Sequence, residues 1–291
     1  MSFNPPSSDP LSVELSFRYC EDFTYRHDEN FPVASFFIPK DKRKYIAAIY
    51  AFARTADDFA DEPGVDQQER MGKLIAWEQE LADCYAGTAK RAVFIALRET
   101  INQYDIPQDL FLRLLTAFKS DVTTRRHATF HDVLRYCTNS ANPVGRLVLL
   151  LFGYRDEKLF AYSDHICTAL QLTNFWQDVT VDLDKDRVYL PLEDLRRFGV
   201  SEQELLSRSF TPAFRNLLEF QVTRTREHFE KGKPLLESVR RDLKLELRLT
   251  WRGGMEILRK IENAGYDVLT RRPVLSKIDK LVLLFRSLLK F

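Results

Sequence analysis

Apolar residues recur at spacings of three and four along most of the chain, which places them on one face of an α-helix. Tyr45, Ile49 and Phe52 form one such series, and Leu74 and Trp77 belong to another. Alternating runs of Val, Ile and Thr bounded by turn residues are almost absent. The sequence has only 10 glycines in 291 residues, which is few for a sheet with many tight turns. The pattern therefore predicts an all-α protein.

Local stop signals, rather than a linker, separate the expected helices. Asn142 and Pro143 place a cap residue before a proline that a first helical turn tolerates, and Gly265 stands where a helix should end. No linker rich in Gly, Ser or Pro divides the chain, so we expect one domain over 11–291 after a loose arm over 1–10. The predicted helices span 11–27, 40–61, 66–86, 89–103, 107–121, 129–139, 142–153, 156–183, 202–207, 211–249, 250–264 and 274–289.

Charge and composition exclude several classes of protein. Lys and Arg number 43 against 42 Asp and Glu, so a net charge of +1 provides no field to hold a nucleic acid. The arginine pairs at 125–126 and 271–272 could still meet a small anion. The four cysteines show no Cys-x-x-Cys spacing, which fits reduced thiols. Residues 1–10 do not resemble a secretory signal, and no apolar run is long enough to span a bilayer. We expect a cytoplasmic protein.

Aspartates recur at a spacing of four in two apolar stretches. Asp57 and Asp61 form one pair, and Asp178 and Asp182 form the other. Residues four apart share a helix face, but the stretch 105–109 has the same spacing, so spacing alone proves little. Asp is a poor interior helix residue, and the apolar neighbours of both pairs should face a core. Two helices could thus present four carboxylates.

Carboxylates gathered in a partly desolvated cleft repel one another, by about 4 kcal/mol per close pair at the effective dielectric of a protein surface. A cation should therefore lie among them. Only oxygen ligands are available, because no His or Cys stands at ligand spacing. This donor set selects a hard ion such as Mg²⁺, which keeps some waters and binds a substrate phosphate.

Polar residues next to the aspartates could complete such a site. Arg54 lies three residues before Asp57, and Asn174 and Gln171 lie four and seven residues before Asp178. Hydrogen bonds between helices explain the two amides equally well. Aromatic residues crowd the same segments; core packing explains most of them, and a few could line a dry tunnel and steady a carbocation. They are Phe31, Phe36, Phe37, Phe52, Phe59, Phe175 and Trp176.

At these residues the chain resembles the squalene and phytoene synthase family, the head-to-head prenyl transferases. The stretch 50–61, YAFARTADDFAD, is similar to the first aspartate-rich motif of that family. The stretch 171–182, QLTNFWQDVTVD, followed by DRVYLP at 186–191, is similar to the second. The resemblance covers about residues 15–280. It implies the isoprenoid synthase fold, a single helical bundle around a central active-site cavity.

The resemblance also implies roles for individual residues. Asp57, Asp61, Asp178 and Asp182 would be catalytic ligands of Mg²⁺, and Asp58 would help to hold the diphosphate. Asn174 would also be catalytic. The other residues at matching positions would bind substrate; they are Ser35, Arg54, Gln171, Tyr266 and Arg271.

Within the family the chain is most similar to the bacterial hydroxysqualene synthase branch of hopanoid biosynthesis. The stretches that carry this likeness are ENFPVAS at 29–35, SANPVGR at 140–146 and NFWQD at 174–178. Gln177 replaces the arginine that usually precedes the second motif, and Thr138 and Asn139 stand where relatives place a tyrosine. The branch implies that presqualene diphosphate is ionised, rearranges as a carbocation and is captured by water, without NADPH. Gln177, counted as catalytic, and Asn139 would hold that water.

Two other readings remain open. The first is condensation of two prenyl diphosphates, as in a presqualene diphosphate, squalene, dehydrosqualene or phytoene synthase. The second is a non-catalytic assembly or scaffold relative. The absence of a Gly-x-Gly-x-x-Gly fingerprint does not decide between reducing and non-reducing enzymes, since reducing relatives bind NADPH without one.

The expected partners are a prenyl diphosphate, presqualene or farnesyl, and no nucleic acid. The resemblance also implies functional coupling to a presqualene diphosphate synthase and a hydroxysqualene reductase. The C-terminal stretch 277–291 combines an apolar face with Lys277, Lys280, Arg286 and Lys290. This leaves peripheral contact with the inner face of the membrane open, with an ordinary docked terminal helix as the alternative.

Overall fold

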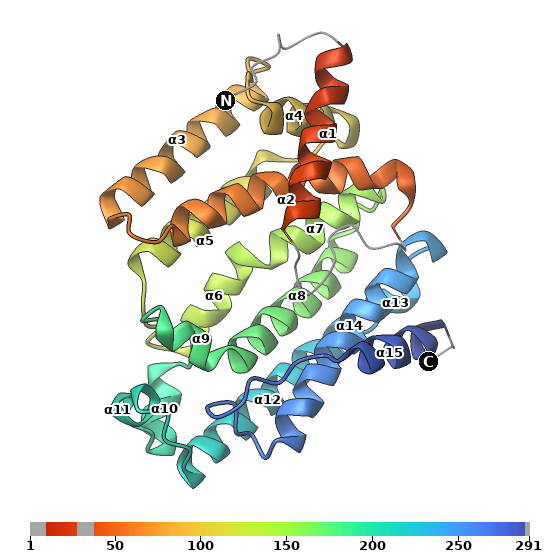
Figure 1. The fold of residues 1–291 in the computed structure, drawn as a ribbon. Helices are drawn as coiled ribbons and strands as arrows, with labels where there is room; N and C mark the ends of the chain where they lie inside the picture. Colours follow the sequence, from red (N-terminus) through yellow and green to blue (C-terminus); the bar gives the residue numbers. More distant parts are fainter. Residues whose placement is uncertain (1–9, 28–37, 289–291) are drawn as a thin grey trace. The chain divides into compact units, whose positions relative to one another are not determined.

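The computed structural model describes residues 10–27 and 38–288 of the chain (Figure 1). Its elements are α-helices, and the β-pairing among these residues is limited to one isolated bridge between Arg126 and Val188. The all-α prediction is therefore confirmed. The chain divides into two compact units, one made of residues 1–123 and 146–155, the other of residues 124–145 and 156–291. The prediction of a single domain over 11–291, after an arm over 1–10, stays a prediction.

The first unit is built around α2, which packs against four other helices of the unit. Alanines and large apolar residues share its buried face, so neighbouring helices approach closely. The helices of this unit are α1 (Pro10–Arg26), α2 (Lys40–Asp61), α3 (Gln67–Tyr85), α4 (Ala92–Tyr104) and α5 (Gln108–Thr123). The end of α7 (Asn142–Leu151), which begins in the second unit, also belongs to it.

An aromatic cluster fills the core of the first unit. Phe52 is fully buried, and its ring lies 5.3–6.0 Å from the rings of Phe111, Phe94 and Trp77. The indole N–H of Trp77 donates to the backbone carbonyl of Phe52 at 3.3 Å. These contacts fix α2, whose last turn carries the first aspartate-rich motif, against α3, α4 and α5.

The second unit is built around α8, which packs against α12 and α14 (Figure 1). Glycines permit this close approach, because a Cβ at Gly232 of α12 would lie 2.5 Å from Ile166 of α8, and one at Gly254 of α14 would lie 2.9 Å from Leu170 of α8. The other helices of this unit are shorter or peripheral. The set is α6 (Phe130–Ser140), α8 (Glu157–Gln177), α9 (Val179–Asp184), α10 (Leu192–Phe198), α11 (Glu202–Leu206), α12 (Pro212–Gly232), α13 (Leu235–Ser238), α14 (Arg241–Asn263) and α15 (Lys277–Leu288).

Helices with strong apolar periodicity lie where the sequence predicts them, and 40–61 matches α2 at both ends. The helix predicted over 156–183 is wrong in one respect, because α8 ends at Gln177 and α9 begins at Val179. At the junction, Asp178 has φ −105° and ψ 17°, away from helical values. No Gly or Pro marks this break, so the local sequence does not signal it.

The region after residue 190 departs further from the prediction. The helix expected over 211–249 ends at Gly232, because Pro234 cannot continue an i to i−4 hydrogen-bond ladder. The break expected at 249–250 does not exist, since α14 runs through it. Helix α10 was not predicted; its run of seven residues is too short for a periodic signal.

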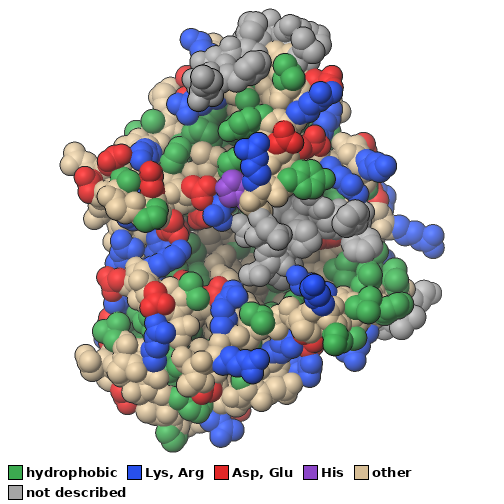
Figure 2. All heavy atoms as spheres, in the orientation of Figure 1, with side chains coloured by type: hydrophobic (Ala, Val, Ile, Leu, Met, Phe, Trp, Pro, Cys, Tyr) green, Lys and Arg blue, Asp and Glu red, His purple; other side chains and the backbone are tan. Residues whose placement is uncertain are grey.

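Charged side chains of both signs are interspersed over the face drawn in Figure 2, in keeping with a net charge of +1. Among residues 10–27 and 38–288, no helix combines the length and the apolar character needed to cross a membrane.

Candidate active site

The end of α2 carries the first carboxylate cluster, defined as Arg54, Asp57, Asp58 and Asp61. Arg54 lies three and four residues before two of these carboxylates and reaches both of them. Its Nε lies 2.9 Å from Asp58 Oδ1, and its Nη1 lies 3.6 Å from Asp57 Oδ2. His27, the residue that follows α1, also approaches Asp58, with Nε2 3.8 Å from Oδ2. The predicted first-motif residues are therefore brought together within one unit.

Negative charge is in excess in this cluster. Burial, together with the neighbouring carboxylates of Asp61 and, from α5, Asp121, raises the pKa of Asp57 to about 6, although Arg54 opposes the shift. Asp121 is buried and was not predicted as part of the site. Carboxylates that raise one another's pKa form a favourable place for an added cation.

The junction of α8 and α9 carries the second carboxylate cluster, defined as Asn174, Asp178, Asp182 and Arg272. Asn174 Nδ2 donates to Asp178 Oδ2 at 2.9 Å. Arg272 binds the same carboxylate through two hydrogen bonds, Nε to Oδ1 and Nη2 to Oδ2, the second at 3.1 Å. Hydrogen bonding to Asp178 and the nearby charge of Asp182 raise the pKa of Arg272. Here an arginine already supplies the counter-charge.

Arg272 directly follows Arg271, the arginine of the expected late Tyr/Arg pair. The predicted residue Arg271 is exposed, and the neighbouring arginine is the one that reaches Asp178. Tyr266 lies in the turn after α14 with φ 67°, a left-handed conformation, and is half-buried. The roles of Arg271 and Tyr266 toward phosphate stay predictions. The arginine pair at 271–272 was the signal that pointed to this segment.

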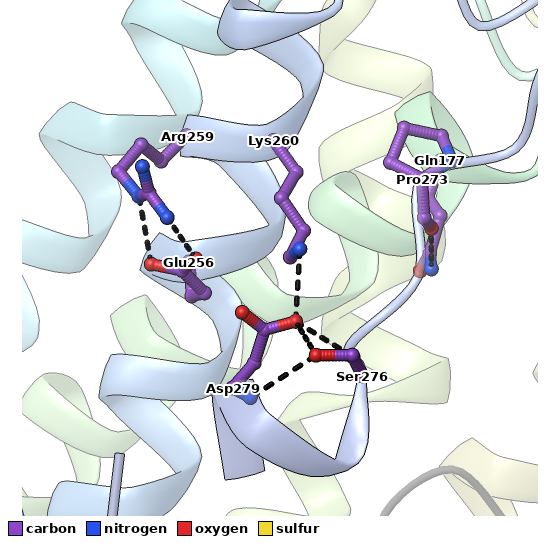
Figure 3. Close-up of polar contacts among 7 residues, drawn as sticks. All are labelled: Gln177, Glu256, Arg259, Lys260, Pro273, Ser276 and Asp279. Atoms are coloured by element: carbon purple, nitrogen blue, oxygen red, sulfur yellow. Dashed lines mark hydrogen bonds and ion pairs between the residues drawn. The ribbon is translucent and has the colours of Figure 1, made fainter. Parts of the chain in front are cut away.

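Gln177 joins α8 to the segment that carries Arg272. Its side chain is buried, and its Nε2 donates to the backbone carbonyl of Pro273 at 2.6 Å (Figure 3). Pro273 follows Arg272 directly, so this bond holds the backbone next to the guanidinium that meets Asp178. The predicted role of Gln177 in holding a water stays a prediction, and one N–H of the amide already donates to this carbonyl.

A pocket in the second unit combines a motif carboxylate with aromatic rings. Phe175 and Tyr189 stack with ring centroids 3.8 Å apart, and both line the pocket together with Asp182. Tyr136 and His127 extend this aromatic group, with Tyr136 5.8 Å from Phe175 and His127 5.5 Å from Tyr189. Such rings could steady a cationic centre next to Asp182. Tyr189 comes from the stretch DRVYLP, which the sequence marks as part of the second motif.

The remaining predicted residues lie on helices of the two units or outside the described residues. Gln171 is half-buried on α8, three residues before Asn174. Asn139, proposed to hold a water, is half-buried on α6. Phe52 and Trp176 are fully buried in the two cores, and Trp176 Nε1 donates to Thr225 Oγ1 at 2.8 Å. Ser35, Phe31, Phe36 and Phe37 lie outside the described residues.

The donor set fits a magnesium ion that relies on its substrate. Within residues 10–27 and 38–288, no three His, Cys, Asp or Glu side chains are arranged to hold a metal by themselves. Mg²⁺ usually binds through one or two carboxylates and completes its shell with waters and substrate phosphates. Asp57, Asp61, Asp178 and Asp182 offer oxygen ligands of this kind. The Arg272 guanidinium binds Asp178, so a positive charge already lies where a divalent ion would also be attracted.

Comparisons with known proteins agree with this geometry. The family model described as squalene/phytoene synthase matches residues 24–279. A hydroxysqualene synthase of Rhodopseudomonas palustris is 36% identical over 224 residues, which are 77% of this chain and 75% of that protein. A phytoene synthase of Thermus thermophilus is 31% identical over 282 residues, 96% of this chain and 95% of that one.

A solved structure shows the same fold. The squalene synthase HpnC of Alicyclobacillus acidocaldarius is 38% identical, with a TM-score of 0.84 over 89% of this chain and 97% of that one. The expected isoprenoid synthase fold is therefore confirmed, and members of this family use a divalent metal to ionise a diphosphate. The match of the family model across both aspartate-rich motifs, together with relatives aligned over most of their length, shows that the chain belongs to the squalene/phytoene synthase family.

Proposed function

We propose that the protein converts presqualene diphosphate into hydroxysqualene in a Mg²⁺-dependent reaction, as a step toward squalene and hopanoids. The carbon–oxygen bond to the diphosphate breaks, the cyclopropylcarbinyl cation rearranges, and a water oxygen bonds to the cation as a proton is lost. Bound Mg²⁺ would stabilise the negative charge that develops on the leaving diphosphate. The observation that carries the proposal is the excess negative charge at Asp57, Asp61 and Asp121, which calls for a cation.

Each cluster has a separate task in this proposal. Asp57 and Asp61 of the first cluster would hold Mg²⁺, as would Asp178 and Asp182 of the second cluster, and Asp58 and Arg54 would orient the diphosphate. Arg54 already lies within ion-pair distance of Asp57 and Asp58, so it limits repulsion before substrate arrives. Asn174 fixes one oxygen of Asp178, which leaves the carboxylate with a defined orientation. Phe175 and Tyr189 stack on each other beside Asp182, where they would limit the access of water to the carbocation.

The hydroxysqualene reaction is preferred to a condensation for two reasons. The chain carries Gln177 where an arginine usually precedes the second motif, and one relative of 36% identity is named hydroxysqualene synthase. The second candidate is a condensing synthase, which the phytoene synthase relative of 31% identity favours. A non-catalytic scaffold is disfavoured because both aspartate-rich motifs keep their carboxylates.

The proposal extends to the surroundings of the enzyme. Presqualene diphosphate must come from an enzyme that condenses two farnesyl diphosphates, and the alcohol must pass to a reductase. We therefore propose functional coupling to a presqualene diphosphate synthase and a hydroxysqualene reductase. The product is a water-insoluble hydrocarbon alcohol, so we place the enzyme in the cytoplasm, in peripheral contact with the inner face of the membrane.

One assay tests these readings against each other. The purified protein is incubated with Mg²⁺ and either presqualene or farnesyl diphosphate, with and without NADPH, and the lipid products are identified by mass spectrometry. We expect hydroxysqualene from presqualene diphosphate, with no requirement for NADPH and no product in excess EDTA. The double variant Asp57→Asn, Asp178→Asn serves as the control for contaminating activity. Conversion of farnesyl diphosphate into a hydrocarbon, or no conversion of either substrate, would overturn the proposal.

A further inference from the structure

Helix α15 is turned with its more apolar side outward. Ile278, Leu281, Phe285 and Leu288 are 75%, 54%, 62% and 60% exposed, and Val282 is 40% exposed. With 3.6 residues per turn these five positions form one continuous stripe along the helix. We call them the α15 stripe. A surface helix normally buries such a stripe, so this orientation calls for an explanation.

Polar contacts hold α15 in this orientation. Asp279, on the inner side, forms an ion pair with Lys260 of α14 at 2.8 Å, and the hydroxyl of Ser276 donates to the same Oδ2 at 2.7 Å (Figure 3). The hydrogen bonds to Lys260 and Ser276 lower the pKa of Asp279 to about 2, so the pair stays charged. At the other end, Ser287 is buried and its backbone carbonyl lies 3.5 Å from Arg248 Nη1. The helix therefore cannot roll to hide the stripe without breaking these contacts.

The stripe is also concentrated in one place. Figure 2 shows hydrophobic side chains gathered where Figure 1 draws α15. Val274, just before the helix, adds a further apolar side chain that is 51% exposed. Elsewhere in the described part of the chain, exposed large apolar residues stand singly, as Ile75 and Val181 do, or in pairs, as Leu15 and Tyr19 do. Scattered apolar residues are normal on a surface, whereas a contiguous patch marks an interaction site.

Positive charge borders the stripe on both sides. By helical geometry Lys277 lies next to one edge of the stripe, and Arg286 lies next to the other. Asp279 is the one acidic residue within Lys277–Leu288, and it is turned inward to Lys260. Arg286 is close enough to Arg252 of α14 to help lower the pKa of that guanidinium, after the larger effect of burial. Cations therefore gather along the border of an apolar face.

We propose that α15 is a docking surface for an anionic lipid bilayer, with the stripe inserted at the level of the headgroups and Lys277 and Arg286 on lipid phosphates. An apolar face of Leu, Ile and Phe bordered by Lys and Arg is the pattern of a helix that lies in the membrane interface. A second copy of the chain fits less well, because a two-fold axis would bring two cation-bordered faces together with no carboxylate between them. This proposal goes beyond the proposed reaction and does not depend on it.

Vesicle binding tests the proposal without substrate, so its outcome is independent of the enzyme activity. Binding of the parent protein is measured by flotation with vesicles of phosphatidylglycerol and phosphatidylcholine, and with vesicles of phosphatidylcholine alone. We expect binding to the anionic vesicles that falls as salt is raised. Leu281→Glu should weaken this binding by more than about tenfold. Arg286→Gln should weaken it less and should reduce its dependence on salt.

A matched control separates the stripe from general surface polarity. Ile75 on α3 is 55% exposed, nearly the same as Leu281 at 54%, so Ile75→Glu adds the same charge at a similar exposure. Ile75→Glu should bind anionic vesicles as the parent does, and circular dichroism should show that all variants are folded. The proposal is overturned if the parent binds no anionic vesicles or if Ile75→Glu loses as much binding as Leu281→Glu. It is also overturned if Leu281→Glu dissociates a dimer while vesicle binding is unchanged.

Discussion

The two carboxylate clusters share one sequence spacing but differ in how their charge is balanced. At the end of α2, Asp57 is crowded by Asp61 and Asp121, its pKa is raised to about 6, and Arg54 compensates only in part. At the start of α9, Asp178 is bound by Arg272 through two hydrogen bonds and by Asn174 through a third. In the first cluster the carboxylates outnumber the nearby cation Arg54, whereas in the second cluster Arg272 neutralises the charge of Asp178. The partners that create this difference come from distant parts of the sequence.

The largest expected effect concerns turnover, and it should be similar at both clusters. Asp57→Asn and Asp178→Asn should each lower kcat by about three orders of magnitude, because each removes charge from a metal that stabilises the departing diphosphate. Asp109→Asn is the matched control, since the pair at 105 and 109 has the same spacing and Asp109 is an exposed partner of Arg113 at 2.7 Å. Steady-state kinetics within about tenfold of the parent for either motif variant would contradict the metal assignment.

The next effect separates the clusters, because the two variants should change stability in opposite directions. Asp178→Asn should lower the free energy of unfolding by about 1–2 kcal/mol, since a carboxylate that is 15% exposed and its arginine partner lose their charge-assisted bonds. Asp57→Asn should raise it by less than about 1 kcal/mol, because the side chain is 41% exposed and water screens the repulsion. Urea denaturation without Mg²⁺ measures both, and changes of the same sign would remove the contrast.

A smaller effect concerns the distribution of products. Gln177→Leu removes the hydrogen bond to Pro273 and the polar group that we propose to hold the water. The variant should still consume presqualene diphosphate but should yield more eliminated or rearranged hydrocarbon relative to alcohol. Asn174→Leu, which removes the other amide of this helix end, should mainly reduce the rate. An unchanged fraction of alcohol, measured by mass spectrometry, would exclude Gln177 from water capture.

The smallest expected effect is a pH dependence that belongs to the first cluster alone. In the unfolded chain Asp57 should lose its proton near pH 3.9, whereas in the metal-free folded protein it keeps the proton to about pH 6. Between these values the folded state binds more protons, so its stability falls as pH rises, and the loss is complete above about pH 7. Relative to the parent, Asp57→Asn should therefore gain stability from about pH 4 to pH 6. A stability difference that is constant across this range would contradict the raised pKa.

Local patterns in the sequence were sufficient for the helices of the first unit and for the residues of the first cluster. Helix 40–61 has continuous apolar periodicity, so its ends and the shared face of Arg54, Asp57 and Asp58 follow from it. The break at Asp178 could not be predicted, because no Gly or Pro marks it and the contact with Arg272 spans 94 residues. For the same reason Asp121 was missed, since only the packing of α5 on α2 brings it near Asp57.

The orientation of α15 is a second feature that the local sequence could not predict. The sequence predicts an amphipathic helix there, but periodicity cannot say which face is buried. The ion pair between Asp279 and Lys260 accompanies the observed orientation, and it joins two helices through side chains that local spacing does not connect.

The most direct test of the account follows the oxygen atom of the product. The protein is incubated with presqualene diphosphate and Mg²⁺ in ¹⁸O-labelled water, and the mass of the extracted alcohol is determined by mass spectrometry. Ionisation followed by water capture predicts hydroxysqualene that carries one ¹⁸O, formed without NADPH and abolished in both Asp57→Asn and Asp178→Asn. An alcohol without the label, or a labelled alcohol formed equally by these variants, would contradict the proposed reaction.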